Sequence, residues 1–197
     1  MRRLGRMAAA VCAVTLGSAW ASCATAAQGG AGAPVTAGEP ALWRTFDMIV
    51  NLQNLPRTYT CDELWYEFRG IMVRLGAWPY SVNILPYHCS PSPHGTLTSP
   101  DVQVGFQLPF FLHGVAAKSA TVHAIERTIR LSPGEPATLK PGDCQLMQQI
   151  SQTLLASLPL RIDEQHFDCT GSARRAADFS VTVTLPVAVK MPPAPTT

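Results

Sequence analysis

The sequence lacks the short motifs that commit a chain to one chemistry. It has no Cys-x-x-Cys pair, no Gly-x-Ser-x-Gly, no glycine-rich phosphate loop and no His-Glu-x-x-His. These absences argue against a thioredoxin-like redox centre, an α/β-hydrolase nucleophile, a phosphate-binding loop and a metalloprotease helix. No catalytic residue is therefore predicted.

Charge is also scarce, and it is balanced. Asp, Glu, Lys and Arg make up 14% of the 197 residues, and no long run of like charges occurs. Three of the 15 basic residues, Arg2, Arg3 and Arg6, lie at the N-terminus, which leaves 12 basic residues against 13 acidic ones in the rest of the chain. No basic patch favours nucleic acid, and no charged stripe favours a membrane-surface helix.

The first 27 residues are typical of a secretory signal peptide. The basic start is followed by an uncharged apolar run over 7–20 and by small residues over 21–27. Signal peptides have this order, and the apolar run is too short to span a bilayer. We therefore expect a periplasmic or secreted protein with no membrane span in its mature chain.

Two alternatives concern the processing of this segment. Cleavage at Ala24-Thr25-Ala26 leaves an even number of cysteines, whereas the earlier small-x-small sequence Ala19-Trp20-Ala21 would add Cys23 as an odd one. We therefore favour the later site. Attachment of a lipid to Cys23 needs an aliphatic residue three positions earlier, where the chain has Trp20.

The mature chain is long enough for one domain with a core of its own. Residues 28–40 are rich in Gly, Ala and Pro and are predicted to be a flexible linker; residues 191–197 are rich in Pro and are predicted to be a flexible tail. The single domain is expected over 41–190.

Two parts of this domain repeat one order of elements. Each has a helix that begins at a cysteine and a strand-length segment that ends at one. Thr60, with Glu63 three residues on, is predicted to form a capping box before the first helix, and Asp143 is expected to cap the second. A further strand precedes each helix, and a strictly alternating strand ending in Leu-Pro closes each part. The sequence predicts a duplicated β-α-β-β repeat over about 44–110 and 118–188, with strands at 46–52, 81–89, 101–109, 120–131, 160–169 and 179–186 and helices from Cys61 and Cys144.

Element lengths predict how the four mature cysteines pair. A helix of ~15 residues runs ~22 Å, and a strand of ~8 residues returns ~26 Å. The end of the strand therefore comes back beside the start of the helix, within disulfide reach. We expect two disulfides, Cys61–Cys89 and Cys144–Cys169.

The predicted fold is α+β: a six-stranded mixed sheet with two helices on one face. A right-handed crossover should make the first and second strands of each repeat parallel. Alternation turns one set of residues toward the helices, namely Val102, Val104, Phe106, Leu108, Phe179, Val181, Val183 and Leu185. The opposite, polar face is the candidate binding surface, and its residues are Gln103, Gln107, Thr182 and Thr184, with Trp78 from a turn.

Three histidines near cysteines, His88, His94 and His166, are the candidate metal ligands. If Cys89 and Cys169 are in disulfides, no thiolate is available to a metal, and the histidine spacing matches no common ligand pattern. The prediction is therefore that the protein has no metal and no other cofactor.

The run Leu-Pro-Arg-Thr-Tyr-Thr-Cys-Asp-Glu-Leu-Trp-Tyr over 55–66 resembles an uncharacterised family of small exported bacterial proteins with no assigned function. The resemblance covers only the first helix and its approach, and it implies export alone.

Two functional hypotheses follow. The favoured one is an exported, non-enzymatic binding module of the bacterial envelope, whose partner is an envelope protein, a peptide or a small ligand, bound on the open sheet face or a sheet edge. The alternative is a small periplasmic metal-handling protein or hydrolase with a His-containing site around 87–94 and His166.

Overall fold

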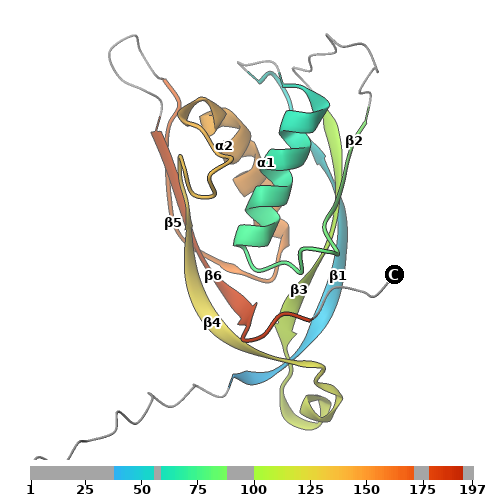
Figure 1. Ribbon diagram of the computed structural model, residues 1–197. Helices are drawn as coiled ribbons and strands as arrows, with labels where there is room; N and C mark the ends of the chain where they lie inside the picture. Colours follow the sequence, from blue (N-terminus) through green and yellow to red (C-terminus); the bar gives the residue numbers. More distant parts are fainter. Residues whose placement is uncertain (1–37, 56–58, 88–99, 171–177, 193–197) are drawn as a thin grey trace, which may run out of the picture. The chain divides into compact units, whose positions relative to one another are not determined.

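Neighbouring strands of this protein all run antiparallel. The computed structural model describes residues 38–55, 59–87, 100–170 and 178–192, and within them six strands form one sheet of order β2-β3-β1-β4-β6-β5 (Figure 1). The elements are β1 (Glu39–Asn51), α1 (Cys61–Arg74), β2 (Asn83–Pro86), β3 (Asp101–Phe111), η1 (Gly114–Ser119), β4 (Val122–Leu131), η2 (Pro141–Asp143), α2 (Cys144–Thr153), η3 (Leu155–Ser157), β5 (Arg161–Asp168) and β6 (Asp178–Ala188).

The α+β class, the six strands and the two helices are confirmed, but the mixed sheet is wrong. In each half the third strand lies between the first two: β3 pairs with both β1 and β2, and β6 pairs with both β4 and β5. The first and second strands do run parallel, as a crossover requires, but they are never neighbours. Every hydrogen-bonded pair is therefore antiparallel, and both halves share one strand order.

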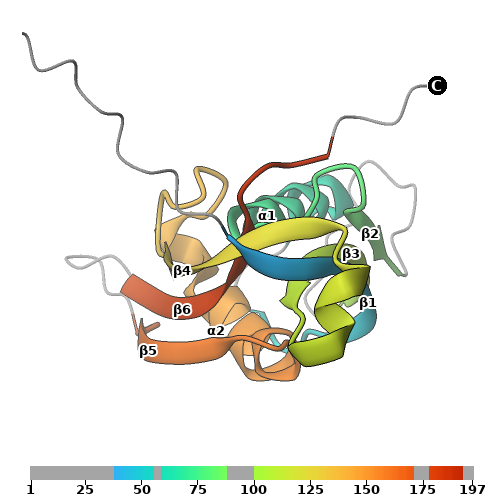
Figure 2. The ribbon, with the colours of Figure 1, turned by 90° about the horizontal axis from the view of Figure 1, so that it is seen from below.

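The sheet is narrow at its centre. Strands β1 and β4 pair over only three residue pairs, Glu39–Ala41 with Val122–Ala124. From this junction the first group (β1, β2 and β3) and the second group (β4, β5 and β6) diverge, and both helices lie between them (Figures 1 and 2). Glu39 and Pro40, which were expected in the linker, are the first residues of β1.

The inward faces of both groups and both helices share one core. All eight residues predicted to face the helices are at most 3% exposed, and all belong to one apolar cluster with the buried residues of α1 and α2. The alternation of apolar and polar residues in β3 and β6 therefore identified the buried face correctly.

Each helix also contacts the group to which it does not belong in sequence. In α1, Gly70 lies against Thr138 of the loop after β4. Gly76, just after the end of α1, lies so close to β6 that a Cβ there would be 3.2 Å from Val187. In α2, the Gln149 side chain accepts from the backbone N–H of Gln53 (2.8 Å) and donates to its carbonyl (2.7 Å). The helices thus hold together two groups that share little backbone pairing.

Local signals at the helix starts are confirmed in one case and corrected in the other. Thr60 and Glu63 form the predicted capping box, with both reciprocal hydrogen bonds present. Asp143, expected to cap α2, makes no side-chain capping hydrogen bond at the start of that helix. Its carboxylate instead accepts from the Tyr59 hydroxyl (3.0 Å) and the Lys140 N–H (2.7 Å), and so connects the start of α2 to the approach to α1.

The Cys144–Cys169 disulfide is confirmed, and it joins the start of α2 to the residue after β5. Cys61 is also disulfide-bonded. Cys89, its predicted partner, lies outside the described residues, as do the predicted signal peptide, most of the linker and the end of the tail. No helix in the described part of the chain has the length and apolar character to cross a membrane.

Removing the observed disulfide should cost stability. We expect the double variant Cys144→Ala/Cys169→Ala to lose about 2–4 kcal/mol of unfolding free energy, because the bond restricts the unfolded chain across a sequence separation of 25 residues. Urea unfolding of the variant and the wild type at one pH measures the difference. An unchanged midpoint with an unchanged slope would contradict it.

The contact between Gly70 and Thr138 predicts a change of sign in a double-mutant cycle. Alanine normally favours a helix over glycine by ~1 kcal/mol, but a Cβ at Gly70 would lie 2.5 Å from Thr138 Oγ1. We therefore expect Gly70→Ala to destabilise the protein by about 1–3 kcal/mol. In a Thr138→Ala background, which removes a buried hydroxyl without a hydrogen-bond partner, the same substitution should stabilise it. Thermal unfolding of the four proteins tests this, and additivity would refute it.

Candidate functional site

The predicted binding residues fall on two surfaces rather than one. Gln103 and Gln107 lie on the outer face of the first group, the face away from the helices, and Trp78 lies beside them. Thr182 and Thr184 lie on the outer face of the second group. The predicted residues therefore belong to two groups of strands, which pair with each other over the three residue pairs between β1 and β4 (Figure 1).

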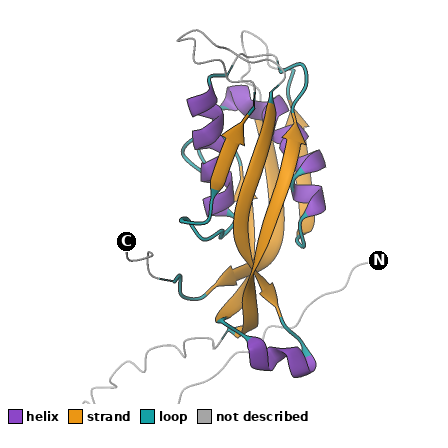
Figure 3. Ribbon diagram, turned by 90° about the vertical axis from the view of Figure 1, so that its right-hand side faces the viewer, coloured by secondary structure: helices purple, strands orange, loops and turns teal. Residues whose placement is uncertain are grey.

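The outer face of the first group has a hollow of about 300 Å³ centred on Gly105, which we call the Gly105 hollow. Gly105 lies in the middle of β3 and pairs with Asp47 of β1 and Asn83 of β2. Paired residues of an antiparallel sheet share a face, so the missing side chain leaves space between two polar ones. Figure 3 looks toward this group of strands. The hollow is lined by Thr45, Phe46, Asp47, Trp78, Ser81, Asn83, Gln103, Gly105, Phe106 and Gln107.

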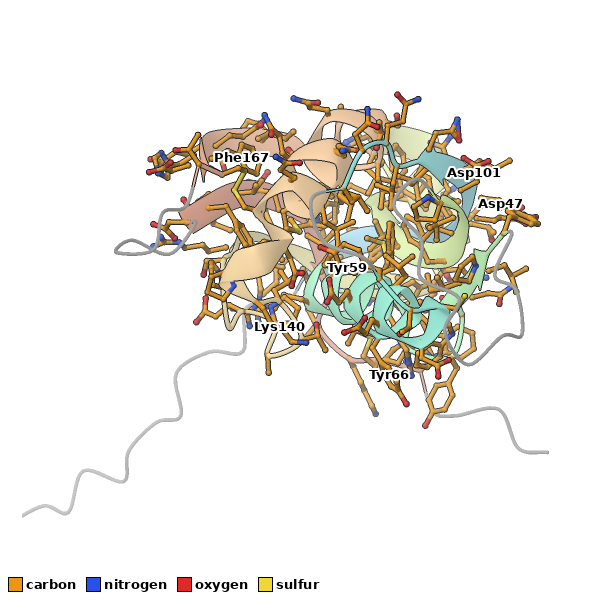
Figure 4. The ribbon with its side chains drawn as sticks, turned by 90° about the horizontal axis from the view of Figure 1, so that it is seen from above. Asp47, Tyr59, Tyr66, Asp101, Lys140 and Phe167 are labelled. Atoms are coloured by element: carbon orange, nitrogen blue, oxygen red, sulfur yellow. A yellow bond between two sulfur atoms is a disulfide. The ribbon has the colours of Figure 1, made fainter. Side chains whose placement is uncertain are left out.

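A hydrogen-bond network holds one side of the hollow in place. The Gln103 amide Nε2 donates to both carboxylate oxygens of Asp47, at 2.9 and 3.1 Å. The Gln103 Oε1 accepts from the Tyr87 hydroxyl. The carboxylate therefore has a fixed direction, and Figure 4 shows Asp47 on the outside of β1, away from the helices.

The other side is formed by the turn after α1. The backbone N–H of Trp78 donates to the backbone carbonyl of Gln107 (3.1 Å), and the backbone N–H of Gln107 donates to the Ser81 hydroxyl (2.9 Å). The turn thus continues the sheet beyond β2. The Trp78 ring meets Tyr80 edge to face, with centroids 6.1 Å apart, so two aromatic rings lie next to the polar groups. The indole Nε1–H of Trp78 is buried without a hydrogen-bond partner.

Apolar side chains stand exposed around this polar hollow. Ile49 and Leu85 both pair with Gln103, on either side of it, and they are 62% and 46% exposed. Tyr80 is 63% exposed. A face that combines preset hydrogen-bonding groups with exposed apolar ones has the composition of a binding site.

The backbone at position 105 does not require a glycine. A Cβ at this position would meet only Asn83 atoms at 3.8 Å, which is ordinary contact, and its φ is not among the positive values. Position 182 corresponds to Gly105 when the Leu-Pro pairs within β3 and β6 (108–109 and 185–186) are aligned. In the second group, Thr182 pairs with Arg130 and Glu164. The position equivalent to the centre of the Gly105 hollow therefore carries a side chain between two others.

On the outer face of the second group, Thr184 is covered by neighbouring side chains, and a hollow of about 330 Å³ lies at one end of that face, lined by residues that include Glu126, Arg161 and Pro186. Thr184, expected on a solvated face, is only 5% exposed. Its hydroxyl donates to Asp163 Oδ2 (2.5 Å) and lies 2.9 Å from the Thr128 hydroxyl. Asp163 reaches it because a bulge in β5 between Ile162 and Glu164 turns that residue toward Thr184. The expectation of an open polar face was therefore wrong at Thr184.

Asp163 also pairs with a cation. Its Oδ1 accepts from Arg161 Nε at 2.6 Å. The hydrogen bond from Thr184, followed by the one from Arg161, lowers the pKa of the Asp163 carboxyl below its ordinary value. The network thus joins Asp163, Thr184, Thr128 and Arg161 to one another within the protein.

A larger hollow of about 490 Å³ lies on the outside of α1, beside Tyr66 (Figure 4). Its two arginines are already engaged. Arg69 donates to the Pro79 carbonyl (3.3 Å), and Arg74 lies 3.7 Å from the Glu135 carboxylate. The walls are otherwise mostly apolar, so this hollow offers little directed hydrogen bonding.

The sheet edges are poorly suited to pairing with another strand. At one edge β2 has four residues and ends at Pro86, and at the other β5 has a bulge and mostly exposed polar residues. Short strands, proline and bulges are the features that protect an edge. The face is therefore a better binding surface than either edge.

The candidate metal ligands do not form a site in the described residues. His166 lies in exposed β5 opposite Ser180, while His88 and His94 lie outside the described part of the chain. Within that part, no three side chains of His, Cys, Asp or Glu come together as metal ligands would.

Comparison with known proteins gives no family to draw on: no family model, curated protein or solved structure matches the chain. The site is therefore argued from its own geometry.

Sequence reasoning missed three residues of the Gly105 hollow, Asp47, Asn83 and Ser81, which do not belong to β3. Gly105 itself could have been found, because a glycine inside an otherwise regular strand often marks a close approach or an open space.

The Asp163 network predicts a specific response to acid. A folded-state pKa below the unfolded value contributes stability above the ordinary carboxyl pKa of about 4, and that stability is lost as the pH falls below it. The wild type should therefore lose stability more steeply below pH 4 than Asp163→Asn. Urea unfolding from pH 6 to pH 2 measures both slopes. Glu164→Gln, in the same strand, is the control and should follow the wild type; parallel curves for Asp163→Asn and wild type would disprove the role.

Proposed function

We propose that this protein is an exported, non-enzymatic binding module of the bacterial envelope, and that it binds its partner at the Gly105 hollow. The observation that carries this proposal is the arrangement of Asp47, Asn83, Gln103 and Gln107 around a glycine that the fold does not need. Side chains from three strands surround the space, and the Gln103–Asp47 bonds fix part of it before any partner arrives. Such preorganisation lowers the entropic cost of binding.

The difference between the two groups supports the same proposal. We infer that they derive from a duplicated β-α-β-β unit, since they share one strand order and both close with a Leu-Pro strand. In the second group the place that corresponds to the hollow carries the side chains of Thr182, Arg130 and Glu164. The second group then acts as scaffold, and the first group is the one that binds.

Export is supported by the signal-like N-terminus and by the Cys144–Cys169 disulfide. Disulfides persist in oxidising compartments such as the periplasm or the exterior of the cell. The partner is accordingly expected among envelope components.

Binding to isolated envelope material tests the proposal. The mature wild type should sediment with purified envelope fragments, and Gly105→Val should lose most of this binding because its side chain fills the hollow. Thr182→Val, the equivalent substitution in the second group, should sediment like the wild type. Thermal unfolding checks that Gly105→Val is folded; we expect it to gain about 0.5–1 kcal/mol, since a β-branched residue replaces a glycine in a strand.

The outcomes separate clearly. Loss of binding in Gly105→Val alone, with unchanged or raised stability, supports a site at the hollow. Equal sedimentation of all three proteins would assign binding to another surface, and no sedimentation of the wild type would remove the envelope as the source of the partner. Either result overturns the proposal.

A further inference from the structure

We propose that the ligand of the Gly105 hollow is a neutral sugar unit of a glycan chain; this inference rests on the proposed function of that site. It goes further by naming the chemistry that the lining residues recognise. The argument uses their hydrogen-bonding capacity, their charge, the neighbouring rings and the size of the space.

The polar lining consists of groups that suit hydroxyls. Asn83 and Gln107 carry amides, which donate and accept, and Asp47 accepts only. The Gln107 Nε2 makes one long bond, 3.3 Å, to the Thr45 hydroxyl, and Asn83 is exposed. A sugar ring offers adjacent hydroxyls that each donate and accept, so neighbouring hydroxyls can meet an amide and a carboxylate together.

The charge of the lining argues against ionic ligands. None of the lining residues is Lys, Arg or His, and Asp47 is the one acid among them. An anion would be repelled by that carboxylate and would find no cation there. A cation would compete with the Gln103 amide, which already donates to both oxygens of Asp47. A neutral polar ligand fits this balance best.

Aromatic rings supply the apolar part of the site. Trp78 lines the hollow, and Tyr80, which meets the Trp78 ring edge to face, is 63% exposed. The C–H groups on the face of a sugar ring carry slight positive charge and pack on the negative face of an aromatic ring. A peptide would more naturally use a sheet edge, and both edges here are protected.

The size of the site favours one unit of a longer chain. About 300 Å³ lies at the lower limit for ligand pockets, and the hollow opens on a flat sheet face. Ile49 and Leu85 extend that face along the row next to Gly105. Neighbouring units of the glycan would lie across these exposed side chains.

Titration of the ¹⁵N-labelled mature protein with neutral oligosaccharides tests the inference. The probes are short oligomers of glucose, of galactose and of N-acetylglucosamine, and the comparison ligand is a blocked neutral tripeptide. At least one oligosaccharide should shift the resonances of Gly105, the Gln103 and Gln107 side-chain amides and the Trp78 indole. Gly105→Val should weaken that ligand at least tenfold, and Thr182→Val should leave its affinity unchanged.

The result also separates this inference from the proposed function. If Gly105→Val abolishes envelope binding but no oligosaccharide shifts these resonances at millimolar concentration, the glycan is wrong and the binding site stands. Shifts caused by the tripeptide alone would likewise replace the sugar by a peptide. If an oligosaccharide binds equally to wild type and Gly105→Val, it binds elsewhere and the inference fails.

Discussion

The three residue pairs between β1 and β4 are the constraint on which the rest of this structure depends. So short a junction cannot by itself hold six strands in one plane, and the two groups diverge from it. The helices fill the space between the groups, and each helix contacts the other group through Gly70, Gly76 or Gln149. The outer faces of the two groups carry different side chains, while both inner faces share one core.

The two outer faces show how differently one strand order can be used. In the second group, a bulge in β5 turns Asp163 onto Thr184, and Arg161 completes a network that satisfies these side chains internally. In the first group, β3 has Gly105 at the position equivalent to Thr182 of β6, and the Gln103–Asp47 bonds beside it border a hollow. Polar residues that are satisfied within the protein contribute stability, whereas those held open at a fixed geometry are available for recognition.

Sequence reasoning predicted what depends on local pattern. The alternation of β3 and β6, the capping box at Thr60 and the Cys144–Cys169 bond all followed from spacing within one element or between neighbours. It did not predict that the third strand of each half enters between the first two, because pairing over long sequence distances leaves no periodic signal. That one difference decides the site: the β1–β3 register brings Asp47 beside Gly105, and the β2–β3 register brings Asn83 there.

In the proposed function, Gly105 is the residue at which stability and binding meet. Glycine inside a strand costs conformational entropy and contributes no packing. Here neither a positive φ nor a close neighbour requires it, since a Cβ would meet nothing nearer than 3.8 Å. At Gly76 the opposite holds, because φ is +85° and Val187 is close. Gly76 is thus explained by the fold, whereas Gly105 provides space among oriented polar groups, and the proposed binding function uses that space.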